Sequence, residues 1–381
     1  MRVSREDAAR RQQVDQAFVR ARDLQAEGRN DEAVKIYEQI LVRFPQHTDS
    51  LTMLASVNYQ LGNDLQADAY LDRAIEAQRF ILERLPEAPT AWAPLANLLL
   101  ARGRPDDRIE AERICRTLNL ALNSIRSDRQ TFLQRRNAAM LSGLPPILIT
   151  TLPKSASESI WNRLAEGLGL AQSHISMGLF PDCCILGPRA RSFADGGVIA
   201  KEHVPATPHN LEMLAAAGVG RVLVHLRDPR QALVSWAHFV ADDVSLRLLA
   251  PIWRRIVPPA QVLARGLPAV TDWSVEHYLP LQVAWVEGWL KAAEAAPQGL
   301  KVHFLDFEGF KSDAEGYLAE ALRFFRIDPA AFESARSAAA EVVHLRRGET
   351  DEWRRVLSPA QRQRAEALVP AALAERFGWS V

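Results

Sequence analysis

The pattern of apolar and polar positions changes once along the chain, near residue 145. The earlier part is typical of paired helices and contains no convincing strand. The later part has short apolar or β-branched runs at 147–152, 197–201, 221–226 and 301–307, separated by helix-like stretches. This alternation predicts an α/β domain with a mainly parallel sheet, in which ligands gather at the carboxyl ends of the strands.

A glycine, an alanine and a large apolar residue recur in the helical part at an interval of 34 residues. A third, later copy follows, and the positions of the three copies are Gly28, Ala33 and Tyr37, then Gly62, Ala67 and Leu71, then Gly103 and Ala111. Residues 12–125 therefore resemble the tetratricopeptide-repeat family, although an ordinary helical bundle with coincidental spacing stays the alternative. We expect a tetratricopeptide-like helical repeat domain over 1–130, a linker over 131–145 and an α/β domain over 146–381.

Composition excludes some classes of function. The 46 basic and 46 acidic residues balance, so no global positive field indicates nucleic acid. The charged N-terminus lacks the apolar centre of a signal peptide, and no apolar run is long enough to span a bilayer. Three cysteines, two of them adjacent, indicate a reducing compartment, and we expect a cytoplasmic protein. HExxH and CxxC patterns are missing, so we expect no metal site.

The stretch ITTLPKSASESIWNRL (149–164) has the order of a strand, a tight loop and a helix start, and such loops often hold a phosphate. Lys154 and Ser155 resemble the end of a Walker A loop, but Pro153 stands where that motif needs glycine. The spacing of Ser155 and Glu158 also fits a capping box, which starts helices of any function. The loop alone leaves phosphate binding and simple capping equally open.

The stretch RVLVHLRDPRQALVSWAHF (221–239) predicts a strand and then a helix, with Asp228 as its N-cap and Pro229 at its first position. Arg227 ends the strand, and the fork of its guanidinium suits a phosphate. Ser235, about two turns into the helix, adds a neutral donor. The alternative is an arginine paired with a surface carboxylate.

The stretch GVIAKEHVPATPHNL (197–211) places Lys201 and His203 two residues apart, so that both face the same side of an extended chain. The unperturbed pKa of histidine lies near neutrality, which suits a general base. For a lone histidine, a hydrogen-bonded structural role is the alternative.

In this order, the three stretches and LRRGETDEW (345–353) resemble the motifs of sulfotransferases that use 3′-phosphoadenosine 5′-phosphosulfate (PAPS), and the resemblance covers residues 145–381. It implies a P-loop-like sulfotransferase fold with His203 as catalytic base, assisted by Lys154 and Lys201. It also implies a set of donor-binding residues: Lys154, Ser155, Ala156, Ser157, Glu158, Ser159, Arg227, Ser235, Phe307, Arg346, Arg347 and Gly348. Three positions depart from the family's pattern, with Ala156 in place of glycine, Gln231 in place of an acidic residue, and Glu352 before Trp353 where the family has a G-D-W order.

The reaction implied by the resemblance is metal-free sulfuryl transfer from PAPS to a hydroxyl or amine. The acceptor stays open between a peptide, a glycan, a carrier-bound group and a small molecule. Arg254, Arg255 and Arg265 suit an anionic acceptor or form a solvated face. The helical repeats dock an extended acceptor, bind a protein partner or dimerise the chain. A P-loop kinase or nucleotide hydrolase, and a non-catalytic nucleotide-binding repeat scaffold, are the alternative functions.

Overall fold

The computed structural model describes residues 5–61, 63–84, 89–118, 129–178, 180–242, 255–334 and 349–379. The chain divides into two compact units. The first comprises Met1–Arg129, Cys184–Ala190 and Thr207–Ala217, and the second comprises Gln130–Cys183, Arg191–Ala206 and Gly218–Val381. Two short segments that follow residue 183 therefore belong to the first unit.

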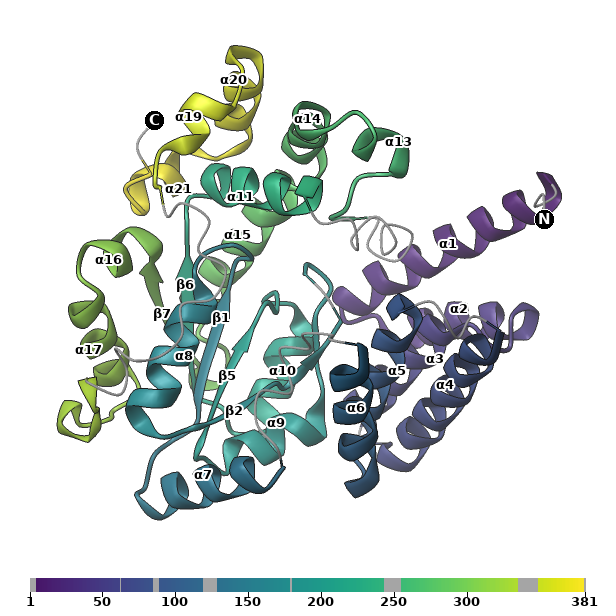
Figure 1. Cartoon of the computed structure of the whole chain (residues 1–381), viewed down its shortest axis with the longest axis horizontal. Helices are drawn as coiled ribbons and strands as arrows, with labels where there is room; N and C mark the ends of the chain where they lie inside the picture. The colour runs from purple at the N-terminus through teal and green to yellow at the C-terminus, as the bar shows by residue number, and fades with distance from the viewer. Residues whose placement is uncertain are drawn as a thin grey trace. The chain divides into compact units, whose positions relative to one another are not determined.

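The first unit is helical. Its helices are α1 (Arg5–Ala26), α2 (Asn30–Arg43), α3 (Thr48–Gln60), α4 (Asp64–Arg84), α5 (Pro89–Arg102), α6 (Pro105–Leu118) and α10 (Pro208–Ala216). Successive helices pack in pairs, α1 with α2, α3 with α4 and α5 with α6 (Figure 1). Gly28 and Gly103 lie between paired helices at φ +79° and +72°, a conformation that glycine adopts without strain. Gly62 lies outside the described residues.

The side chains with repeat spacing are buried in this unit. Ala33, Ala67 and Ala111 are fully buried, as are Tyr37 and Leu71. Alanine at these positions lets the paired helices approach closely, because no larger side chain separates their backbones. The pairing of helices is thus observed, whereas membership of the tetratricopeptide-repeat family stays a prediction.

The second unit contains a parallel sheet of five strands in the order β2-β5-β1-β6-β7. The strands are β1 (Ile147–Thr151), β2 (Ala171–Ser173), β5 (Val198–Glu202), β6 (Arg221–Leu226) and β7 (Lys301–Asp306). Strands β1 and β5 are buried along their whole length, as expected for parallel strands covered on both faces. The four strands predicted from apolar runs are confirmed to within one residue at each end.

The described residues also contain two further strands and a set of α-helices. They are β3 (Ser176–Met177), β4 (Cys184–Ile185), α7 (Arg129–Leu141), α8 (Ser157–Leu168), α9 (Gly187–Ala194), α11 (Pro229–Asp242), α13 (Ala260–Leu263), α14 (Leu267–His277), α15 (Leu279–Ala295), α16 (Phe307–Ser312), α17 (Ala314–Phe324), α19 (Glu352–Val356), α20 (Pro359–Leu368) and α21 (Ala371–Arg376). Helix α20 begins with the predicted N-cap Ser358, which forms a capping box with Gln361. Residues 131–145, expected to be a linker, include most of α7.

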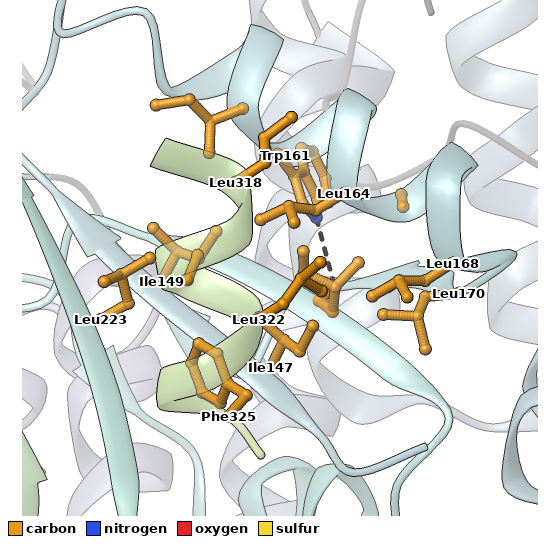
Figure 2. Packing of buried hydrophobic residues seen from close by; sticks show 14 of the residues in the cluster. Ile147, Ile149, Trp161, Leu164, Leu168, Leu170, Leu223, Leu318, Leu322 and Phe325 are labelled. Carbon is orange, nitrogen blue, oxygen red and sulfur yellow. Dashed lines mark hydrogen bonds between the residues drawn. The ribbon is translucent and has the colours of Figure 1, made fainter. Parts of the chain in front are cut away.

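The core on one face of the sheet lies between the strands and α7, α8 and α17 (Figure 2). Ile147 and Ile149 of β1 point into it, together with Ile199 of β5 and Leu223 of β6. Because side chains alternate along a strand, the later residues of the same parity continue this face toward the carboxyl ends. Thr151, Lys201, His203, His225 and Arg227 all have that parity.

We predict that Gly197→Ala destabilises the second unit more than Gly143→Ala does. Both glycines have positive φ, +69° and +71°, but a Cβ at Gly197 would lie 2.4 Å from the Arg136 carbonyl oxygen, whereas Gly143 has no atom within 4 Å. The common left-handed conformation costs about 1–2 kcal/mol in each variant. The steric overlap adds roughly 1–3 kcal/mol at Gly197 alone.

Urea unfolding of the two variants measures the difference. Equal losses in the free energy of unfolding would show that α7 does not pack against the start of β5 in solution.

Candidate functional site

The loop between β1 and α8 has an unusual backbone. Lys154 and Ala156 both have positive φ, +67° and +62°, although neither is glycine. Alternation of left-handed and right-handed residues turns successive amide groups to one side of a loop and makes a concavity that binds anions. Left-handed alanine costs about 1–2 kcal/mol, and strain of this kind clusters at ligand sites.

The capping-box interpretation of this loop is wrong. The N-cap of α8 is Ala156, which has no side-chain cap bond. The hydroxyl of Ser155 instead donates to the Leu152 carbonyl at 2.6 Å and lies 2.5 Å from the Thr151 hydroxyl. The carboxylate of Glu158 pairs with the Lys201 ammonium. Because no side chain caps α8, the positive end of its dipole stays available to an anion.

His203 follows β5 directly, and its ring is tied to the end of β1. Its Nδ1 lies 2.6 Å from the Thr151 carbonyl oxygen. A carbonyl only accepts, so Nδ1 carries the proton and Nε2 of the neutral ring has a lone pair. Desolvation is the largest cause that lowers the pKa of His203, to about 4, and the nearby Lys201 ammonium lowers it further. The ring is therefore neutral at pH 7 and able to accept a proton.

Lys201, the penultimate residue of β5, is only 4% exposed. Its ammonium pairs with Glu158 and lies 5.5 Å from the centre of the Trp161 ring. Both partners belong to α8. The lysine thus connects the strand that leads to His203 with the helix that follows the loop.

Arg227 follows β6 and is also tied to the loop. Its Nη1 donates to the Lys154 carbonyl at 2.8 Å and its Nη2 to the Glu349 carbonyl at 2.7 Å. The guanidinium lies 4.1 Å from the centre of the Phe307 ring, which is 4% exposed. Phe307 therefore supports Arg227 in this structure, and its role in donor binding stays a prediction.

The other predicted residues are placed as follows. Asp228 precedes α11 and accepts from the Arg230 amide at 2.9 Å, which agrees with its predicted capping role. Ser235 is buried within α11, and the Lys154 ammonium lies 4.1 Å from the ring centre of Phe239 in the same helix. Ser157 and Ser159 lie in the first turn of α8.

Several predicted residues fall elsewhere. Arg346, Arg347, Gly348 and Arg254 lie outside the described residues. Arg255 pairs with Asp182, and the side chain of Arg265 is exposed.

The sequence patterns missed two groups at this site. His225, inside β6, is fully buried, with Nε2 2.6 Å from the Ser155 carbonyl and Nδ1 2.9 Å from the Tyr317 hydroxyl. Burial lowers the pKa of His225 to about 4. Glu308, just beyond β7, has its pKa raised to about 7, first by burial and then by Asp306. The signal for His225 is a single polar residue in the otherwise apolar run VLVHL.

Two departures from the family's pattern contact each other. The Gln231 amide nitrogen donates to the Glu352 carboxylate at 3.3 Å, and its oxygen accepts from the Trp353 amide at 3.0 Å. Both side chains are buried, at 0% and 2% exposed. An acidic residue at position 231 would bury a second carboxylate beside that of Glu352, so the glutamine suits its partner.

No protein-family model and no curated protein matches the sequence. Among solved structures, the crystal structure of mouse sulfotransferase SULT7A1 complexed with PAP is similar, with a TM-score of 0.40 and 16% sequence identity. The match covers 62% of this chain and 88% of that chain.

Two further findings concern the described residues only. No helix among them is both long enough and apolar enough to cross a membrane. Within the same ranges, no three histidine, cysteine or acidic side chains gather as metal ligands would.

We predict that Ala156→Gly leaves the chain as stable as before or stabilises it by up to about 1 kcal/mol. Relief of the left-handed strain offsets the conformational entropy that glycine adds to the unfolded state. Ala319→Gly, inside α17, is the matched control and is expected to lose about 0.5–1 kcal/mol. Chemical unfolding of both variants tests the loop geometry, and equal destabilisation would contradict it.

We also predict that Gln231→Glu lowers the free energy of unfolding by roughly 2–4 kcal/mol at pH 7, because it buries a second carboxylate beside Glu352. Repulsion raises the pKa of the new carboxyl in the folded state. The destabilisation is therefore largest above that raised folded pKa, shrinks as the pH falls toward the unfolded pKa of about 4.3, and is lost below it.

The double variant Gln231→Glu, Glu352→Gln restores one carboxylate and one amide in exchanged positions and should recover most of the loss. If the single and the double variant unfold alike, the two side chains do not interact.

Proposed function

We propose that the chain transfers a sulfuryl group from PAPS to a hydroxyl or amine acceptor, with His203 as the general base. One observation carries the proposal: residues from two separate sequence motifs contact the segment from the end of β1 to the start of α8, which is itself the third motif. His203 holds the Thr151 carbonyl, Lys201 pairs with Glu158, and Arg227 holds the Lys154 carbonyl. A chance match of motifs to the sequence would not require their side chains to meet.

The residues at the loop fit an anionic donor. The concave backbone at Lys154–Ala156 and the uncapped start of α8 provide amide donors for the 5′-phosphosulfate group. Arg227 and Ser235, from β6 and α11, would hold the 3′-phosphate. Lys154, whose ammonium lies 4.1 Å from the ring centre of Phe239, would balance the charge that develops on the transferred group.

The chemistry assigned to the chain is proton transfer and positioning. PAPS supplies the sulfur–oxygen bond that breaks, and the acceptor oxygen or nitrogen forms the new bond to sulfur. His203 Nε2 accepts the acceptor's proton while Nδ1–H stays bonded to Thr151. This bond fixes the tautomer and the orientation of the ring, which is what a general base needs. Glu158 holds Lys201 at the adjacent position.

Replacement of His203 separates the role of the general base from binding of the donor. His203→Ala is expected to retain the affinity for adenosine 3′,5′-bisphosphate and to lose about a hundredfold or more in the rate of transfer. Because the pKa of His203 is lowered to about 4, its unprotonated form predominates above that value. The kcat/KM of the wild type should therefore be flat near neutrality and fall only as the pH drops toward 4.

The converse variant, Arg227→Ala, should weaken binding of the bisphosphate about tenfold or more. Calorimetry with adenosine 3′,5′-bisphosphate and with ATP, and transfer of labelled sulfate to a library of acceptors, provide the measurements. Preference for ATP would favour a kinase or nucleotide hydrolase over this proposal. Binding of the bisphosphate without turnover on any acceptor would favour a scaffold.

A further inference from the structure

Side chains that belong to β5 and β6 or follow them hold three carbonyl groups at the end of β1 and in the β1–α8 loop. The Thr151, Lys154 and Ser155 carbonyls accept from His203, Arg227 and His225 in turn. The His225 bond, at 2.6 Å, involves a side chain with no solvent exposure. His225 has no role in the proposed reaction, so its contact with the loop needs its own explanation.

Because the peptide bond is trans, the His225 contact also sets the direction of the amide group that follows the Ser155 carbonyl. In a trans peptide, the carbonyl and the following N–H point in opposite directions. With the Ser155 oxygen turned toward His225, the Ala156 N–H is turned away from it. Rotation of this peptide by half a turn would bring an oxygen to the concave side, where it would repel an anion.

Tyr317 completes the arrangement. A carbonyl cannot donate, so His225 Nε2 carries a proton, and the neutral ring then offers Nδ1 as an acceptor to the Tyr317 hydroxyl at 2.9 Å. The two rings also meet edge to face, with centroids 5.6 Å apart. Tyr317 belongs to the core cluster, so the hydrogen-bond chain connects the loop to the packed centre of the unit.

We propose that His225 and Tyr317 are positioning residues that orient the Ser155–Ala156 peptide, so that its amide faces the phosphate group of the donor. The proposal rests on the function proposed above, because it takes PAPS as the anion. The two residues touch neither donor nor acceptor and act through the loop backbone.

The test depends on where a replacement side chain carries its donor. Glutamine places its amide nitrogen about where His225 has Nε2, and its amide oxygen can accept from Tyr317. Asparagine is one bond shorter and cannot reach the Ser155 carbonyl from the same backbone position. The pair His225→Gln and His225→Asn thus separates the hydrogen bond from the mere presence of a polar side chain.

Calorimetry with adenosine 3′,5′-bisphosphate is expected to give about tenfold weaker binding for His225→Asn and a change within about threefold for His225→Gln. Tyr317→Phe, which removes one hydroxyl, should weaken binding by about threefold. Amide hydrogen exchange at Ala156, measured without ligand, should rise in His225→Asn and Tyr317→Phe and stay near wild type in His225→Gln.

His209 provides the matched control. It is also buried, at 1% exposed, and its Nε2 contacts the Ile185 carbonyl at 3.2 Å, within the first unit. His209→Asn should lower the melting temperature, as His225→Asn does, but leave bisphosphate affinity and Ala156 exchange unchanged.

Two outcomes overturn the positioning role: a folded His225→Asn variant with wild-type affinity and exchange, or a His209→Asn variant that loses affinity equally. If the wild type does not bind the bisphosphate at all, the donor assignment fails. Amide hydrogen exchange at Ala156 then tests the orientation of the Ser155–Ala156 peptide without the donor. Equal exchange rates in His225→Gln and His225→Asn would refute the proposed orientation.

Discussion

Hydrogen bonds to the backbone carbonyls of residues 151–155 hold the loop on which the candidate site depends. His203, His225 and Arg227 approach this loop from β5 and β6, and each occupies one carbonyl. Two left-handed residues cost the loop about 1–2 kcal/mol each, whereas a hydrogen bond contributes about 0.5–1.5 kcal/mol net, and more when it is charged. The strained shape is thus about balanced by side chains that the parallel sheet brings to one edge.

The sequence predicts the sheet well because its central strands are buried on both faces and appear as mainly apolar or β-branched runs. Strand β2, with three residues, is too short to show a period. The capping box failed for a different reason, since the start of α8 is set by the positive φ of Ala156, and this leaves the Ser155 hydroxyl to bond inside the loop. Backbone dihedral angles of this kind leave no trace in a sequence when the residue is not glycine.

The side chains Lys154, Lys201, His203 and Arg227 were predicted from the resemblance of their motifs, and in the structure they meet at one loop. The contacts of His225 with Tyr317 and of Gln231 with Glu352 could not be found in this way, because the partners are distant in sequence. The pairing of Gln231 with Glu352 shows why the two departures are best considered together. Each looks like a weakened motif alone, but in the fold they form one buried contact.

The residue after the proposed base is fixed from the opposite face of the sheet. The Val204 carbonyl accepts from the Thr150 hydroxyl at 3.0 Å and from the indoles of Trp285 and Trp289 at 2.9 and 3.0 Å. With Nδ1 bonded to Thr151 on one side and this cluster of donors on the other, the His203 backbone has little freedom to follow acceptors of different shapes. Evolution of a new acceptor preference would therefore act on the segments around β5 and leave the position of the base unchanged.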